Sequence, residues 1–305
     1  MLGQEAQGCT PPHALPLSNM VPIFTTRKFR SPDGLTLTGD VAGPAGAPVV
    51  ALLHGGGQTR HAWRDATRVL AASGYRVVNL DARGHGDSNW PADGRYTLDV
   101  LAADLRAVLA EFPGPYAIVG ASMGGVTALE LAASNTVSGI VAIVMVDIVP
   151  RVEQVGSERI EAFMRANPDG FATLEEAADA VAAYNPFRPR PHNPAGLMTN
   201  LRRRDNGRLY WHWDARLIDG PYPLESQQFG EPLLAASRRV RVPVMLVRGL
   251  RSDIVSDAGI EEFRRSVPHL EVYEVERAGH MVVGDRNDAF NEGAFRFLDR
   301  VMPLS

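Results

Sequence analysis

The sequence predicts an α/β fold, in which a mostly parallel central sheet carries helices on both faces and a helical cap is inserted into the chain. Short β-branched runs alternate with longer stretches of helical periodicity, a pattern typical of parallel strands joined by right-handed crossovers. Several of the runs are apolar throughout, as strands buried on both faces require. The alternation stops between about Pro150 and Val240 and then resumes. With 305 residues, of which 45% are hydrophobic, the chain can bury a large core.

The strands are expected in the order in which these runs occur. Two strands, Arg27 to Arg30 and Leu35 to Val41, flank a turn at Pro32-Asp33-Gly34. The later runs are short and apolar, and we expect strands at residues 48–53, 76–80, 116–119, 140–146, 242–247 and 271–275.

Helices are expected between the strands, at residues 61–73, 97–112, 123–133, 257–267 and 288–301. In the second of these, apolar residues from Leu98 to Leu109 recur on one helical face. Thr97 is a suitable N-cap for that helix, and Pro113 is a suitable end. Gly74 is a suitable C-terminal cap for the first helix.

The chain is therefore expected to have three parts. Residues 23–149 and 241–305 are predicted to form the α/β core. Residues 150–240 are rich in Ala, Arg, Pro and aromatic residues, and they are predicted to form a helical cap over the ends of the strands. Residues 1–22 lack the basic start and the continuous apolar segment of a secretory signal, so we expect a disordered or extended leader.

Composition excludes several classes of function. The formal net charge is -4, and the one tight basic run, Arg202 to Arg204, is expected to be a solvated helix face, so no nucleic-acid partner is predicted. No segment approaches the roughly 18 apolar residues of a membrane span. The single cysteine, Cys9, excludes an internal disulfide and favours a cytoplasmic protein. We expect a monomer or homodimer that acts on a small molecule and needs neither a metal nor an organic cofactor.

Ser122 is the candidate nucleophile. It lies in Gly120-Ala121-Ser122-Met123-Gly124, after an apolar run and at the start of a predicted helix. In this context G-x-S-x-G forms a nucleophile elbow, in which the serine backbone is strained and its Oγ points out over the edge of the sheet. The alternative is a glycine-rich turn with a helix-capping serine. The preceding strand and the following helix favour the nucleophile.

Residues His54 to Gly57 follow the third strand and predict an oxyanion hole. Acyl transfer places negative charge on one oxygen, and losing one backbone N–H donor to that oxygen typically costs roughly 2.7–4 kcal/mol. We expect one donor to be the N–H of Met123, the residue after the nucleophile. We expect the other to be Gly56, with Gly57 as second choice.

His280 is the candidate general base, because it follows a strand and a glycine near the end of the chain. In the order Ser, Asp, His the acid precedes the base, and Asp253, just past the penultimate strand, is predicted to accept the Nδ1–H of His280. Asp147 is the rival, because it ends the preceding strand on the same edge of the sheet. For Asp147 the favoured interpretation is an N-cap or a loop anchor.

As a set, these motifs resemble the α/β-hydrolase family from about residue 25 to 302. The matching segments are His54–Gly57, Asp81–Ser88, Gly120–Gly125, Arg248–Asp253 and Gly279–His280. The inserted segment resembles the helical cap of the esterase, epoxide hydrolase and haloalkane dehalogenase branches. Related epoxide hydrolases and dehalogenases use an aspartate nucleophile, whereas Ser122 suits carbonyl substrates. The expected activity is hydrolysis of a carboxylic ester, thioester or lactone through an acyl-enzyme.

Four residues are candidates for lining the substrate pocket: Gly57, Trp63, Trp211 and Trp213. For the tryptophans of the predicted cap, core packing is an equally good interpretation. Other functions remain open on the same fold: a cofactor-free oxygenase or perhydrolase, a C–C bond hydrolase, or a non-catalytic ligand receptor that keeps the triad.

Overall fold

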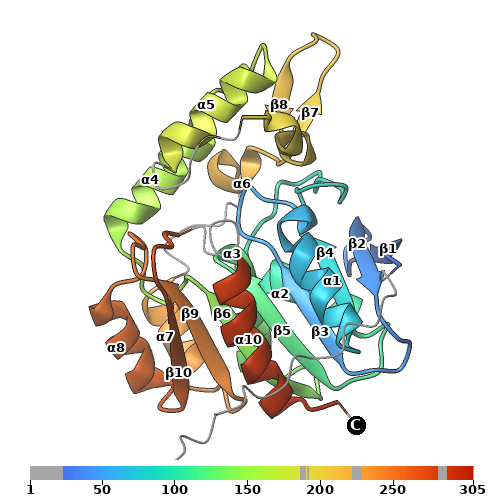
Figure 1. The fold of residues 1–305 in the computed structure, drawn as a ribbon, viewed down its shortest axis with the longest axis vertical. Helices are drawn as coiled ribbons and strands as arrows, with labels where there is room; N and C mark the ends of the chain where they lie inside the picture. The colour runs from blue at the N-terminus through green and yellow to red at the C-terminus, as the bar shows by residue number, and fades with distance from the viewer. Residues whose placement is uncertain (1–22, 186–189, 191, 222–228, 281–286, 305) are drawn as a thin grey trace, which may run out of the picture.

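The centre of the molecule is a twisted, mostly parallel sheet (Figure 1). The structure is a computed structural model that describes residues 23–185, 190, 192–221, 229–280 and 287–304, so the predicted leader lies outside the described residues. Within them the sheet has eight strands in the order β1-β2-β4-β3-β5-β6-β9-β10. The strands are β1 (Thr25–Arg30), β2 (Thr36–Ala42), β3 (Val49–Leu53), β4 (Arg76–Asp81), β5 (Tyr116–Ala121), β6 (Ile140–Val146), β9 (Val244–Gly249) and β10 (Leu270–Val275). The β1–β2 and β2–β4 pairs are antiparallel, and the other pairs are parallel.

Helices cover both faces of this sheet (Figure 1). One layer packs on the face formed by Ala51 and Leu53, and the other packs on the face formed by Val50 and Leu52, as the alternation of side chains along a strand requires. The first layer comprises α2 (Leu98–Leu109), α3 (Met123–Ser134), α7 (Glu231–Ser237) and α8 (Asp257–Ser266). The second comprises α1 (Arg64–Ala72) and α10 (Asn287–Val301). The predicted α/β class is confirmed.

Between β6 and β9 the chain builds a separate group of elements above the carboxyl ends of the strands (Figure 1). These elements are α4 (Gln154–Arg165), α5 (Leu174–Tyr184), the 3-10 helix η2 (Pro194–Asn200), β7 (Leu201–Arg203), β8 (Leu209–Trp211) and α6 (Arg216–Asp219). These elements, together with the described residues that join them, form the cap segment.

Two details differ from the sequence-based expectation for this stretch. The cap segment contains an antiparallel hairpin, β7–β8, so Arg202 and Arg203 lie on a strand and not on a helix face. Strands of three residues carry too little periodicity to be recognised. In addition, α7 falls within residues 150–240 but packs with the core, because Leu233 and Ala236 are buried in the same cluster as α3 and α8.

The segment that follows β8 is bound to the core through its main chain. Gly86 N–H donates to the carbonyl of His212 at 3.0 Å, and Asp214 N–H donates to the carbonyl of Gly84 at 2.9 Å. Between them, His85 and Trp213 form an antiparallel bridge. The cap segment is therefore joined to the loop after β4 by sheet-like hydrogen bonds. None of the helices in the described part of the chain is long and apolar enough to cross a membrane.

Candidate active site

Ser122 occupies a sharp turn between β5 and α3. Its backbone has φ 45° and ψ −112°, a left-handed conformation that non-glycine residues rarely adopt. The glycines beside it are sterically required: a Cβ on Gly120 would lie 2.2 Å from the carbonyl of Gly124, and a Cβ on Gly124 would lie 2.5 Å from the carbonyl oxygen of Leu53. The sequence motif therefore forms the elbow that it predicts.

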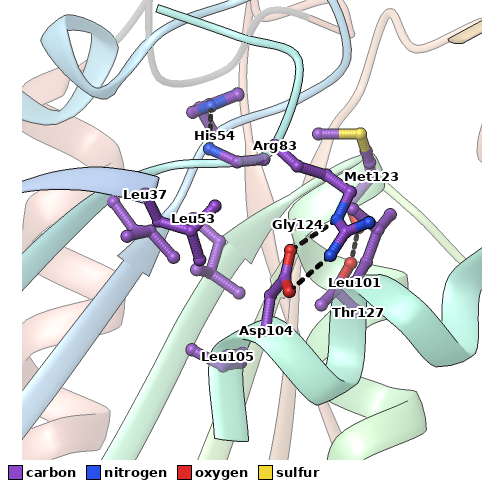
Figure 2. A pocket seen from close by; sticks show the side chains of 12 residues that line it. Leu37, Leu53, His54, Arg83, Leu101, Asp104, Leu105, Met123, Gly124 and Thr127 are labelled. Atoms are coloured by element: carbon purple, nitrogen blue, oxygen red, sulfur yellow. Dashed lines mark hydrogen bonds and ion pairs between the residues drawn. The ribbon is translucent and has the colours of Figure 1, made fainter. Parts of the chain in front are cut away.

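A buried ion pair lies near the start of α3 (Figure 2). The Arg83 guanidinium donates to both carboxylate oxygens of Asp104, at 2.6 and 2.7 Å, and Arg83 is fully buried. Asp104 lies on α2, and Arg83 belongs to the loop after β4. Figure 2 shows this pair beside Met123 and Thr127, which lie in the first turns of α3. A bidentate pair in this position fixes the loop after β4 against α2.

His280 is held by Asp147. Its Nδ1 lies 2.9 Å from Asp147 Oδ2, and the Asp147 side chain is fully buried. The same carboxylate accepts hydrogen bonds from Gly249 N–H at 2.9 Å and from the Ser252 hydroxyl at 2.5 Å. Asp147 follows β6 with φ 48°, a conformation that aspartate tolerates better than most residues. The remaining nitrogen of the ring, Nε2, is thereby left for proton transfer.

Asp253 is not the partner of His280, which corrects the first choice made from the sequence. Its carboxylate accepts from Arg159 Nη1 at 2.9 Å, and both side chains are partly exposed. The reason is the close approach of α4, since a Cβ on Gly156 would lie 2.2 Å from the carbonyl oxygen of Asp253. That contact brings Arg159, one turn further along α4, onto the Asp253 side chain. Asp147, the rival named from the sequence, takes the position next to the imidazole.

The loop after β3 passes beside Ser122. A Cβ on Gly55 would lie 3.5 Å from the Ser122 Cβ. The Gly55 N–H donates to Gln58 Oε1 at 3.0 Å, and the Gly57 N–H donates to His85 Nε2 at 3.2 Å. Among the hydrogen bonds of the described residues, the N–H of Gly56 has no acceptor. Of the three glycines 55–57, Gly56 is therefore the one whose N–H is not engaged in a described hydrogen bond, whereas Gly57, the second choice from the sequence, donates to His85.

Two buried histidines, both neutral, hold this loop by hydrogen bonds. His54 Nδ1–H donates to the carbonyl of Gly55 at 2.8 Å, and its Nε2 accepts from Ala82 N–H at 3.0 Å. His85 donates from Nδ1 to the carbonyl of Arg83 and accepts at Nε2 from Gly57. Burial lowers the pKa of His54 to about 4 and that of His85 to about 3. Both rings therefore keep an acceptor nitrogen at neutral pH.

Ser122 and His280 line one cavity of about 270 Å³ between the core and the cap segment. Gly56, Gly57 and Met123 border it on the core side. The cap segment supplies mostly apolar and aromatic walls: Ile160, Phe163, Met164, Tyr184, Trp211 and Trp213. Among the described residues that line it, the Asp, Glu, Lys, Arg and His residues are Glu161 and His280, and Glu161 is paired with Arg165 at 2.8 Å. The cavity thus offers a polar corner around Ser122 and an apolar interior.

Trp63 lies elsewhere, so its predicted role in substrate binding is wrong. It is 1% exposed and packs against Phe290 of α10, with ring centroids 5.3 Å apart, on the opposite face of the sheet. Its position directly before α1 turns the side chain inward to the core. The other three candidates, Gly57, Trp211 and Trp213, do line the cavity.

The chain forms a strand, an elbow and a helix at the carboxyl edge of a mostly parallel sheet, beneath an inserted cap segment. This is the architecture of α/β-fold hydrolases. Comparison with family models agrees, because residues 50–292 match the description "Alpha/beta hydrolase family". The chain therefore belongs to the alpha/beta hydrolase family. No group of three or more His, Cys, Asp or Glu residues that could hold a metal ion occurs among the residues whose placement the structure gives.

Individual relatives agree with this assignment. The chain is 32% identical over 253 residues to the esterase Rv0045c of Mycobacterium tuberculosis, which covers 81% of each chain. A solved structure of that esterase gives a TM-score of 0.73 at 28% identity and covers 92% of this chain and 93% of the other. An alpha/beta hydrolase from Novosphingobium aromaticivorans gives a TM-score of 0.76 at 27% identity, covering 91% and 99%.

Sequence reasoning did not single out His85 or Met164. His85 lies in the segment Asp81–Ser88, for which no site role was predicted, and nothing local indicates that its ring reaches the loop after β3. A usable signal was the presence of two histidines, His54 and His85, at the ends of adjacent strands, whose rings lie 4.9 Å apart. Met164 belongs to a helix whose orientation over the sheet the sequence does not specify.

Proposed function

We propose that this protein is a serine hydrolase that cleaves a carboxylic ester of a small, largely apolar substrate through an acyl-enzyme. The observation that carries the proposal is the hydrogen bond between Asp147 and His280, in a cavity that Ser122 also lines. The likeness to a mycobacterial esterase supports the choice of an ester. Asp147 takes the role of the acid that the sequence first assigned to Asp253.

In acylation, the Ser122 hydroxyl attacks the ester carbonyl while His280 Nε2 accepts its proton. Asp147 accepts the hydrogen bond of Nδ1–H, which fixes the tautomer and stabilises the imidazolium. The carbonyl oxygen becomes an oxyanion that the N–H groups of Gly56 and Met123 stabilise. Both amides border the cavity, and neither has an acceptor among the described hydrogen bonds.

The tetrahedral intermediate collapses when His280 gives the proton to the leaving alcohol, which departs and leaves Ser122 acylated. In deacylation, water attacks the acyl carbon while His280 takes its proton. His280 then returns that proton to the Ser122 oxygen, and the carboxylic acid is released. The chemistry uses residues of the chain and water alone.

The cavity favours an uncharged acyl group. Its walls are mostly apolar, and the one carboxylate among the described cavity residues, Glu161, is already paired with Arg165. Burying an unpaired charge in such a cavity is unfavourable. Aromatic and aliphatic side chains instead gain free energy from covering an apolar chain.

The test is hydrolysis of p-nitrophenyl esters of increasing acyl length by the wild type and by Ser122→Ala. We expect turnover by the wild type and loss of at least about 10³-fold in kcat in the variant, since only binding and the oxyanion donors remain. Full activity of Ser122→Ala would refute the proposal. Activity that survives Ser122→Ala but is lost in His280→Ala would point instead to a base-catalysed reaction of the cofactor-free oxygenase type.

A further inference from the structure

The loop that carries the proposed oxyanion donor Gly56 has little restraint of its own. It contains three consecutive glycines, and glycine restricts the backbone least of all residues. Hydrogen bonds on both sides of Gly56 therefore hold the loop in place. The Gly55 N–H donates to Gln58 Oε1 at 3.0 Å, and the Gly57 N–H donates to His85 Nε2 at 3.2 Å. The direction of the Gly56 N–H depends on these two bonds.

The His85 ring is in turn held by its own main chain and by the cap segment. Its Nδ1–H donates to the carbonyl of Arg83 at 3.0 Å, so both ring nitrogens are bound. Residues 84–86 pair with residues 212–214 of the cap segment through an antiparallel bridge, flanked by main-chain hydrogen bonds of 2.9 and 3.0 Å. The position of the His85 ring therefore depends on where residues 212–214 lie.

Tyr96, a fully buried residue just before α2, contacts both of these paired segments. Its hydroxyl donates to Oδ2 of the buried Asp214 at 2.7 Å. The same hydroxyl lies against the other segment, since a Cβ on Gly84 would lie 2.4 Å from its oxygen. Arg216 also donates to the Asp214 carboxylate, but it belongs to the cap segment itself. Tyr96 therefore ties Asp214 to the core.

We infer that Tyr96 is a positioning residue for the oxyanion hole, an inference that rests on the proposed function. Its hydroxyl holds Asp214 and, with it, the paired segments that carry His85. The His85 ring then orients the Gly57 N–H, next to the oxyanion donor Gly56. Tyr96 is not among the residues that line the cavity, so it acts on a hydrogen bond of the transition state without touching the substrate.

The test is steady-state hydrolysis of p-nitrophenyl butyrate by Tyr96→Phe, which removes the hydroxyl and keeps the ring in its apolar cluster with Met123 and Leu217. A displacement of about 1 Å can cost about 100-fold in rate, so we expect the smaller shift here to lower kcat about 10-fold. An interaction made only in the transition state affects kcat, so KM should change less than about 3-fold.

Tyr75→Phe is the matched control. Tyr75 is equally buried, and its hydroxyl also donates to an aspartate, Asp299, at 3.0 Å. Its loss should destabilise the fold in thermal melts, as in Tyr96→Phe, but should leave kcat at the wild-type value. In NMR spectra the amide resonance of Gly57 should move in Tyr96→Phe and stay in place in Tyr75→Phe.

A double variant distinguishes positioning from a general loss of stability. If Tyr96 acts through His85, adding Tyr96→Phe to His85→Phe should lower kcat by less than about 2-fold further, whereas independent losses of about 10-fold each would multiply to about 100-fold. Asp214→Asn weakens the same bond from the cap side, because it replaces a charged acceptor by a neutral one. Its loss in kcat should likewise disappear in the His85→Phe background.

The inference alone would be overturned by an unchanged kcat in Tyr96→Phe, by losses that multiply in the double variant, or by an equal loss of kcat in Tyr75→Phe. A wild type that hydrolyses none of the p-nitrophenyl esters would instead refute the proposed function, and the inference with it.

Discussion

Replacing Asp147 by Asn separates the two candidate acids most sharply. The carboxylate of Asp147 is fully buried and accepts from His280, Gly249 and Ser252. An amide in its place offers one acceptor oxygen instead of two, so the amide nitrogen must face either the imidazole or the Gly249 N–H. In the first orientation the imidazole loses the acceptor that selects its tautomer, and in the second the Gly249 N–H loses its acceptor.

The expected loss can be estimated by analogy. In serine proteases the corresponding Asp-to-Asn change lowers kcat by about 10⁴-fold while the geometry is kept. We expect a loss of about 10³–10⁴-fold in kcat for Asp147→Asn. The assay is steady-state hydrolysis of p-nitrophenyl butyrate, with circular dichroism and a thermal melt to establish that the variant is folded.

Asp253→Asn is the matched control, with the same chemical change 106 residues later, counted as 253 − 147. It removes a partly exposed ion pair with Arg159, and such pairs contribute about 0–1 kcal/mol to stability. We expect kcat to stay within about 3-fold of the wild type, which corresponds to less than about 1 kcal/mol in the barrier. If Asp253→Asn lost at least about 100-fold while Asp147→Asn lost less than about 10-fold, the assignment of Asp147 as the acid would be wrong.

Three further predictions follow from the buried side chains around the site. His85→Phe keeps a ring but removes the acceptor of the Gly57 N–H, so kcat should fall about 10-fold with little change in KM, and an unchanged kcat would contradict a positioning role. Trp63→Ala should lower the free energy of unfolding by about 3–5 kcal/mol in urea titrations, whereas KM for p-nitrophenyl butyrate should not change. The pKa values of His54 and His85 in the folded protein, about 4 and about 3, lie below the ordinary value of 6.5. As the pH falls, these histidines are therefore protonated in the unfolded chain at a higher pH than in the folded protein. The free energy of unfolding should therefore decrease below pH 6.5 by up to about 1.4 kcal/mol per pH unit for each histidine. The decrease should be shallower in His85→Phe. If the wild type and the variant showed equal slopes, the buried histidines would not be the cause of the decrease.

The architecture was accessible from the sequence because its signals are local. Buried parallel strands such as residues 48–53 are apolar throughout, and the elbow at Ser122 needs glycines at fixed positions. The structure places each expected strand of the core within a few residues of its predicted range. Where the signal was weak, as in the hairpin β7–β8, the prediction failed because three residues show no period.

The choice between Asp147 and Asp253 was not local. Both residues follow strands of the same sheet, and β6 and β9 are direct neighbours, so chain order alone places either carboxylate near His280. What decides between them is the packing of α4 on the loop after β9, which engages Asp253 with Arg159. That contact depends on Gly156, almost a hundred residues away in the chain, and no local pattern reveals it.

The two sides of the cap segment are attached to the core by different forces. Residues 212–214 are joined to the loop after β4 by main-chain hydrogen bonds, which salt barely affects. The α4 side has one main-chain hydrogen bond, from Glu153 N–H to the carbonyl of Ile254, and Ile160 packs on the core, but it also depends on ion pairs near the surface, Arg159 with Asp253 and, just before α4, Arg151 with Glu262. At high ionic strength these charges are screened, so α4 loosens first while the tryptophan side stays in place. Amide hydrogen exchange should therefore quicken with salt along α4 and remain slow at Asp214, which makes α4 the side from which the cavity opens.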